Sequence, residues 1–141
     1  MSKRIYEASC SCGNLKYFFS TDLPPEKWPV RKCSCSYCIQ RPNHIHCADP
    51  NGTVEFKISD PKKLIRETHD TDADFLLCAE CGGYMGAVMR TARGNFAVLN
   101  IEHIREKLNL PEPRTYDLGN EEMAPKYERR YKNWMPFTGD A

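Results

Sequence analysis

Apolar and polar residues alternate along much of this chain, which is the pattern of half-buried β-strands. The alternation is cleanest over Val54–Ile58. Short strands are also expected over Ile5–Ser9, Asn14–Ser20, Leu64–Thr68, Phe75–Leu77, Tyr84–Arg90 and Asn95–Asn100. The last two strands flank Thr91–Gly94, so they are predicted to form a hairpin.

Helical periodicity is limited to one short segment. Ile101–Leu108 predicts an amphipathic helix, with Asn100 as its cap and Pro111 beyond its end. Pro125–Trp134 is charged and aromatic, and it predicts a helical turn or an extended arm. Neither a repeat, a low-complexity tract nor a linker divides the chain. The pattern therefore predicts one mainly β domain over residues 1–141, with a short helix and a C-terminal arm.

Composition narrows the class of protein. The chain has 141 residues, of which 40% are hydrophobic and 28% charged, as in an ordinary globular domain. Its 20 Lys and Arg against 19 Asp and Glu make a nucleic-acid partner unlikely on charge alone. The sequence has no stretch of the ~18 apolar residues that a membrane span needs. The first residues lack the apolar core of a secretion signal, so a cytoplasmic protein with reduced thiols is expected.

Eight cysteines in a reducing compartment need an explanation other than disulfides. Residues i and i+2 of a strand share a face, so a C-x-C pair can offer two sulfurs to one ion. A C-x-x-C pair followed by glycine makes a tight turn that does the same. Seven of the cysteines fall in such clusters: Cys10-Ser-Cys12-Gly13, Cys33-Ser-Cys35-Ser-Tyr-Cys38 and Cys78-Ala-Glu-Cys81-Gly82.

The two clusters that end in glycine predict one closed zinc site. Cys10, Cys12, Cys78 and Cys81 would supply four thiolates, which is the ligand set of a structural zinc. The site would tie the N-terminal strands to the middle of the chain. Zinc binding at such sites is worth on the order of 10–16 kcal/mol at neutral pH, more than the stability of a typical domain. Loss of the metal is therefore expected to unfold the domain.

The middle cluster predicts a second zinc of a different kind. Cys33, Cys35 and Cys38 supply three sulfurs, and three protein ligands with one open position are typical of a zinc that acts on a substrate. Disulfide pairing is the less favoured alternative in a reducing compartment. A fourth protein ligand would instead close the site, and the candidates are Cys47, His44 and His46.

The three cysteine clusters, in this order, resemble the glutathione-dependent formaldehyde-activating enzyme family, which includes centromere protein V. The resemblance extends from Ala8 to Ile104 and includes the segment Ala97-Val-Leu-Asn100. It implies a β-tent-like fold of packed antiparallel sheets and the same partition of the cysteines into two zinc sites. It also implies a carbon–sulfur lyase activity that joins glutathione and formaldehyde to S-(hydroxymethyl)glutathione. Ser34 stands where members of the family often have His.

The chemistry of an open zinc site suggests which other residues matter. A free thiol titrates near ~8.5, and coordination to zinc can deprotonate it. His44 and His46 are candidates for an acid or base beside the metal. Glutathione carries two carboxylates, so the site should also supply cations, although each is otherwise an ordinary surface charge. The candidates are Arg90, Arg93, Arg114, Lys126, Arg129 and Arg130.

Three functions are compatible with these features. The first is a zinc-dependent carbon–sulfur lyase-type enzyme that acts on an adduct of a small thiol, such as glutathione, and an aldehyde. The second is a non-catalytic, zinc-stabilised binding module with a protein or nucleic-acid partner. The third is a metal- or redox-responsive protein that uses Cys47 as a switchable thiol. An exchangeable ligand on the middle zinc favours the first, coordination by Cys47 the second, and ready oxidation of Cys47 the third.

Overall fold

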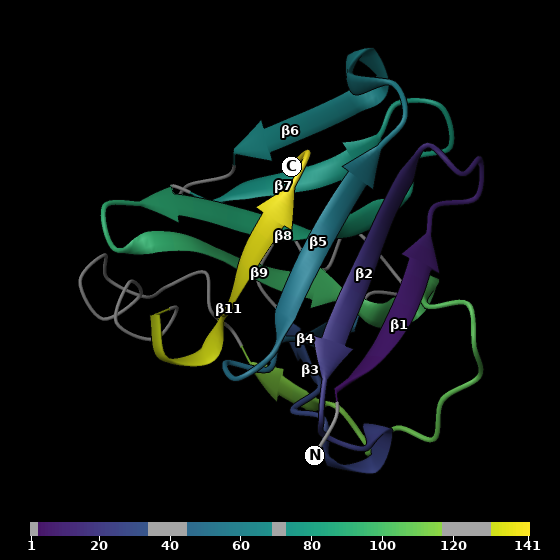
Figure 1. The fold of residues 1–141 in the computed structure, drawn as a ribbon. Helices are drawn as coiled ribbons and strands as arrows, with labels where there is room; N and C mark the ends of the chain where they lie inside the picture. Colours follow the sequence, from purple (N-terminus) through teal and green to yellow (C-terminus); the bar gives the residue numbers. More distant parts are fainter. Residues whose placement is uncertain (1–2, 34–44, 69–72, 117–130) are drawn as a thin grey trace.

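A computed structural model describes residues 3–33, 45–68, 73–116 and 131–141 of the chain (Figure 1). The described residues form three short 3-10 turns: η1 (Pro25–Lys27), η2 (Pro61–Lys63) and η3 (Ile101–His103). Residues 131–133 are helical and lead directly into the last strand. The strands are β1 (Arg4–Ser9), β2 (Leu15–Thr21), β3 (Arg31–Cys33), β4 (His46–Cys47), β5 (Thr53–Ile58), β6 (Leu64–Thr68), β7 (Asp74–Cys78), β8 (Tyr84–Thr91), β9 (Gly94–Asn100), β10 (Arg114–Tyr116) and β11 (Met135–Gly139).

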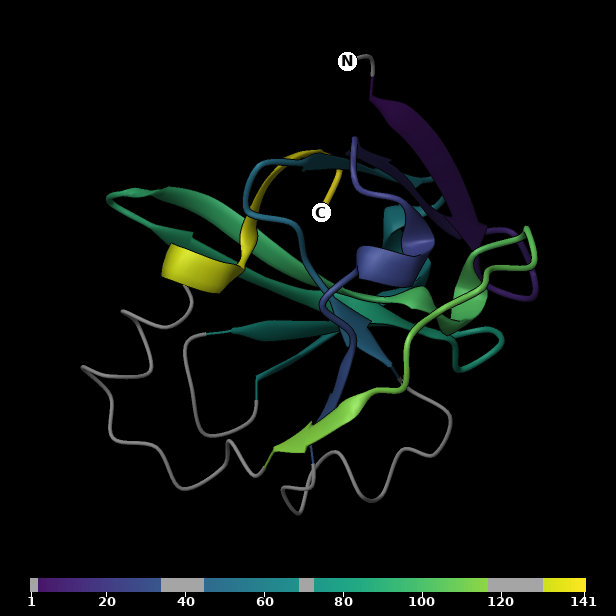
Figure 2. The ribbon, with the colours of Figure 1, turned by 90° about the horizontal axis from the view of Figure 1, so that it is seen from below.

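The strands form two layers that share β11. The first layer holds β1, β2 and β5, which pair antiparallel in that order. The second layer runs from β6 through β7, β8 and β9 to β4, β3 and β10. The strands of the two layers cross at a steep angle in Figure 1, and Figure 2 shows the same crossing from below. The architecture is therefore mainly β, as the sequence predicted, and its sheet is largely antiparallel, with parallel pairing of β3 with β10 and of β5 with β11.

Strand β11 connects the layers because its two halves pair with different strands. Phe137–Gly139 run parallel to Val54–Phe56 of β5. Met135 and Pro136 pair antiparallel with β9. Strands that pass from one sheet to the next in this way make the corners of packed β structures. The described end of the segment predicted as a helical turn or an extended arm, residues 131–133, is helical, and the strand that follows it belongs to both layers.

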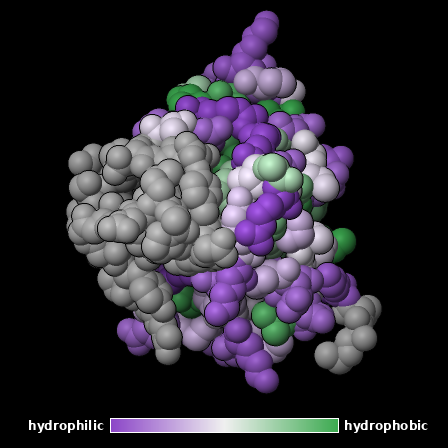
Figure 3. All heavy atoms as spheres, turned by 90° about the vertical axis from the view of Figure 1, so that its left-hand side faces the viewer, coloured by the Kyte–Doolittle hydropathy of each residue, from purple (hydrophilic) through white to green (hydrophobic). Residues whose placement is uncertain are grey.

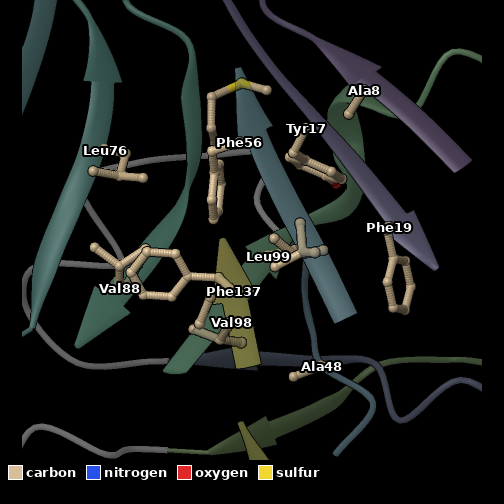
Figure 4. Close-up of a cluster of buried hydrophobic side chains, with 14 of the residues drawn as sticks. Ala8, Tyr17, Phe19, Ala48, Phe56, Leu76, Val88, Val98, Leu99 and Phe137 are labelled. Carbon is tan, nitrogen blue, oxygen red and sulfur yellow. The ribbon is translucent and has the colours of Figure 1, made fainter. Parts of the chain in front are cut away.

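Buried and more exposed residues alternate along the strands, and the buried ones form a core between the two layers. In β2 every second residue is buried, and the same holds for the first four residues of β5. Trp28 closes one end of the core, with its ring 4.9 Å from that of Tyr6 and 5.1 Å from that of Phe19. Figure 4 shows how side chains from both layers gather around this interior, among them Tyr17, Phe19, Phe56, Leu76, Val88, Leu99 and Phe137.

Every strand predicted from the alternation is present, with bounds within two residues of those expected. The predicted helix over Ile101–Leu108 is wrong beyond its first turn. Asn100 does cap a turn, since its side chain accepts a hydrogen bond from Glu102, but that turn ends at His103. Ile104 then forms a β-bridge with Ala8, and this pairing with β1 draws the backbone out of the helical path.

On the face that Figure 3 shows, the described residues are largely hydrophilic. The exposed large hydrophobic residues of the described part of the chain are Ile5 and Ile65, which lie on β1 and β6. Within the same residues, every helical segment is too short to cross a membrane.

Candidate metal centre

The first cysteine pair lies in the tight turn that joins β1 to β2. The turn closes when the Gly13 N–H donates to the Cys10 carbonyl, at 3.0 Å, and the Cys10 N–H donates to Leu15, at 2.9 Å. Gly13 has a φ of 84°, in the left-handed region that suits glycine. The Leu15 N–H also donates to the Cys10 sulfur, at 3.3 Å. The backbone therefore both bends the turn and holds the Cys10 sulfur in place.

The second pair lies in the matching turn between β7 and β8. The Gly82 N–H donates to the Cys78 carbonyl at 2.8 Å, and the Cys78 N–H donates to Gly83 at 3.0 Å. Gly82 has a φ of 74°, the counterpart of Gly13 in the first turn. The two turns belong to different layers, so a metal between them would clasp the layers together.

The four cysteines converge with the spacing of a tetrahedral site. The sulfurs of Cys10, Cys12, Cys78 and Cys81 all lie within 4.8 Å of one another. The Cys10–Cys12 sulfur distance is 3.7 Å and the Cys12–Cys78 distance is 3.4 Å. A tetrahedron with Zn–S bonds of ~2.3 Å has sulfur–sulfur edges of about 3.8 Å. These residues therefore fit a metal ion, and the soft four-sulfur donor set suits zinc or iron.

The two turns lie so close together that only glycine fits at position 83. A Cβ atom on Gly83 would lie 2.9 Å from the Cys10 Cβ and 3.5 Å from the Cys81 sulfur. Carbon atoms in ordinary contact are ~3.5–4.0 Å apart. Gly83 thus sets how closely the turns approach, and sequence reasoning missed it even though the Gly-Gly doublet after Cys81 was visible.

Hydrogen bonds give the two exposed cysteines, Cys12 and Cys81, very different pKa values. Burial alone would raise the pKa of Cys81, but hydrogen bonds from the backbone N–H groups of Cys12 and Gly83, and from neighbouring thiols, lower it to about 6. The backbone at Asn14 acts to lower the pKa of Cys12, but Cys78 and the other thiols raise it to about 12. Without metal the cluster thus stabilises one thiolate, and a bound cation would displace the remaining protons.

A basic side chain lies beside the cluster. Lys63 Nζ forms an ion pair with Glu80 at 3.1 Å, and the Ala79 N–H donates to the Lys63 carbonyl at 2.8 Å. The pKa of Lys63 is raised, first by its hydrogen bond with Glu80 and also by the charge of Cys12. A lysine near four thiolates offsets part of the negative charge that such a centre carries with a divalent ion. Spacing in the sequence gave no sign of this contact.

The predicted second zinc site lies mostly outside the described residues. Cys33 is the last residue of β3, and its backbone pairs with Tyr116 of β10. Cys35 and Cys38 fall in residues 34–44, as does His44, so their assignment stays a prediction.

Cys47 lies apart from the four-cysteine cluster. It is on β4 opposite Leu99, and its side chain is fully buried. Burial raises its pKa to about 12, with opposing effects from Arg31 and Asp49. Reactive cysteines are accessible and have low pKa values, so these properties disfavour the switchable thiol considered above.

His46, which precedes Cys47 on β4, is buried and has a polar partner. Its Nε2 lies 2.9 Å from the Tyr84 hydroxyl, and the two rings meet edge to face. The Asn100 amide donates to the Tyr84 carbonyl at 2.8 Å and accepts from the Ile45 N–H at 3.1 Å. This network links the strand after the second cysteine turn to β4. Tyr84, which the sequence marks only as the start of a predicted strand, is therefore a further residue of interest.

The predicted substrate cations have varied positions. The Arg90 guanidinium lies 5.3 Å from the centre of the Phe137 ring, and that of Arg93 lies 3.9 Å from the Tyr131 ring. Both arginines are at the tip of the β8–β9 hairpin, at the opposite end of β8 from Tyr84. Arg114 begins β10, next to β3. The remaining candidates, Lys126, Arg129 and Arg130, fall outside the described residues.

Comparisons with known proteins reveal a similar fold. Neither the protein-family models nor the curated proteins include a match to this chain. The crystal structure of a Rhodobacter sphaeroides protein is similar, with a TM-score of 0.58 and 19% sequence identity. The match covers 77% of this chain and 98% of that one. At this level of identity the similarity concerns the fold alone.

Proposed function

We propose that this chain is a zinc-dependent carbon–sulfur lyase-type enzyme, which acts on the adduct of a small thiol and an aldehyde as an S-(hydroxymethyl)glutathione synthase does. One observation carries the proposal. The four sulfurs at Cys10, Cys12, Cys78 and Cys81 have the spacing of a closed tetrahedral site, which leaves no ligand position for a substrate. Substrate chemistry would then belong to the separate cluster that starts at Cys33.

Two zinc ions per chain are part of this proposal. The four-sulfur centre holds the structural ion, and Cys33, Cys35 and Cys38 hold the second one. Zinc at the second cluster would lower the pKa of a bound thiol, and so supply thiolate at neutral pH.

The reaction itself requires no redox partner. A bond forms between the thiol sulfur and the aldehyde carbon, while the carbonyl π bond breaks. The proton of the thiol ends on the former carbonyl oxygen, so atoms and electrons balance. The protein's residues have to hold the thiol and the aldehyde in contact, because formaldehyde is reactive enough for positioning to contribute much of the rate.

Glutathione is the thiol that the resemblance of the cysteine clusters supports. The cytoplasm is the compartment we infer, since it keeps both this thiol and the eight cysteines reduced.

The test is exchange NMR on a mixture of glutathione and formaldehyde, with and without zinc-loaded protein. We expect the protein to increase the exchange rate between free thiol and adduct. The Cys35→Ser variant, with native circular dichroism, is the matched control and should lose the increase. An unchanged rate with wild-type protein at two zinc equivalents would exclude this activity for glutathione, and would favour a zinc-stabilised binding module.

A further inference from the structure

The first layer has an outer face that no other described element covers. This outer face is the side of β1, β2 and β5 that turns away from the core, toward the viewer in Figure 1. In Figure 2 it lies along the top, and no described helix or strand lies above it. Buried and more exposed residues alternate along all three strands, so the more exposed residues identify the outer face.

Two rows of residues with opposite charge cross the outer face. Residues paired on neighbouring strands share a face, so the register of β1, β2 and β5 defines each row. The acidic row is Glu7, Phe18 and Glu55, and the basic row is Ser9, Lys16 and Lys57. The rows are two residues apart along each strand, about 6.6 Å. The outer face therefore carries two carboxylates in one line and two ammonium groups in the next.

Most of these charges have no partner of opposite sign within the chain. Glu7 forms an ion pair with Arg105 at 3.3 Å. Among the residues that the structure describes, Glu55, Lys16 and Lys57 form no ion pair. Lys16 and Lys57 are also directly paired across β2 and β5, and like charges at such positions destabilise a sheet. Opposite charges placed over the basic row would relieve this repulsion.

The order of the two rows makes the outer face complementary to itself. A two-fold axis that runs across the strands, between the rows, turns a second copy over and exchanges its rows. Glu55 then lies opposite Lys57 of the second copy, and the symmetry repeats this contact with the roles of the two copies reversed. Phe18 lies opposite Lys16 of the second copy, where an ammonium group can pack on the aromatic ring. Facing sheets are ~10 Å apart, a gap that long charged side chains span.

We propose that this chain forms a weak homodimer in which two outer faces pack on each other across this two-fold axis. The register of the acidic and basic rows carries the inference. A second copy is the occupant because its rows match in spacing as well as in charge. The contact is small and polar, which corresponds to a reversible association. The dimer is independent of the proposed lyase activity.

Sedimentation equilibrium of the zinc-loaded protein tests the dimer, at concentrations from about 10 μM to about 1 mM. We expect dimers that dissociate as salt is added, because exposed ion pairs are screened. Glu55→Lys places lysine opposite Lys57 at both symmetric contacts. Lys57→Glu brings carboxylates together in the same way. Each variant should dimerise more weakly than the wild type by about tenfold or more.

A mixture of these two variants gives the sharpest result. In a mixed dimer both contacts again join a lysine to a glutamate, so the mixture should associate although neither variant does so alone. The double variant Glu55→Lys/Lys57→Glu should dimerise like the wild type for the same reason. Glu26→Lys and Lys27→Glu make the same charge changes on η1, outside the two rows, and should leave dimerisation unchanged. Circular dichroism and zinc content establish that each variant is folded.

Every outcome of these measurements bears on the dimer. Recovery in the mixture supports it, because a second chain cannot restore a contact that lies within the first. A wild-type protein that stays monomeric at about 1 mM and low salt overturns it. Dimers that both charge reversals leave intact use another surface, and they overturn it too. Loss in each single variant with no recovery in the mixture or the double variant contradicts the pairing of Glu55 with Lys57.

Discussion

Replacing Gly83 with alanine tests whether the approach of the two cysteine turns governs metal binding. The new Cβ would lie 2.9 Å from the Cys10 Cβ. Carbon contacts of ~3.5–4.0 Å require the turns to separate by at least about 0.6 Å. Metal–ligand distances tolerate only about 0.2 Å. Overpacking of this kind costs about 1–3 kcal/mol, which corresponds to roughly 5- to 150-fold in metal affinity.

Gly82→Ala is the matched control. Gly82 has a φ of 74°, but a Cβ atom there would have nothing within 4 Å, so alanine is strained by conformation alone. That strain, about 1–2 kcal/mol, acts on one hairpin and does not change the distance between the two turns. Gly82→Ala should therefore lower the melting temperature but weaken zinc binding less than Gly83→Ala does.

The assay is zinc competition against a chromophoric chelator, combined with thermal melting of the loaded protein. We expect Gly83→Ala to release zinc at lower chelator concentration than either the wild type or Gly82→Ala. Wild-type zinc affinity in Gly83→Ala would refute the reasoning, because the clash would then be relieved without moving the sulfurs.

Four other measurements test the site. Cys78→Ser should lose one zinc equivalent and the cooperative melting transition, whereas Cys47→Ser should lose stability but no zinc; native melting of Cys78→Ser would contradict a structural role. Cys35→Ser should keep the fold and lose one zinc equivalent by atomic absorption, so retention of two equivalents would disprove the partition. Under conditions in which the metal-free protein keeps its native circular dichroism, Cys81 should react with iodoacetamide with a midpoint near pH 6, since its lowered pKa makes thiolate available above that pH and removes it below; a midpoint near the ordinary thiol value of 9.0 in such folded protein would contradict the hydrogen bonding described. Tyr84→Phe should destabilise the protein by about 1–3 kcal/mol in urea unfolding, because it removes the buried hydrogen bond between the Tyr84 hydroxyl and His46, and an unchanged midpoint would show that the bond contributes nothing.

The long strands were predictable because each carries its own signal. β2 and β5 alternate between core and solvent, so their sequences report their faces directly. β8 is buried at six successive positions, but the glycines and turn residues around it still mark its limits.

The short strands were not predictable from such signals. β3 and β4 contain three and two residues, too few for any periodicity. β11 contains Pro136, which normally argues against an interior strand because it lacks an N–H donor. Its place in the sheet is set by pairing with β5 and β9, which no local pattern records. The same is true of Ile104, where pairing with β1 replaced the expected helix.

Spacing of the cysteines indicated which four come together, because tight turns with glycine have few geometries. It gave no information on the burial of Cys10 and Cys78 compared with the exposure of Cys12 and Cys81. Burial depends on which layer covers each turn. Contacts made by Lys63 and Gly83 likewise depend on tertiary packing.

The position of β11 between β5 and β9 has a consequence for synthesis on the ribosome. All other strands of the described residues precede it in the chain, so part of one edge of each neighbour stays unpaired until β11 is made. Unpaired strand edges are templates for association with other chains. The four clustered cysteines all lie within the first 81 residues, well before β11. Metal bound by these four cysteines can therefore connect the two layers before β11 is available to pair with β5 and β9.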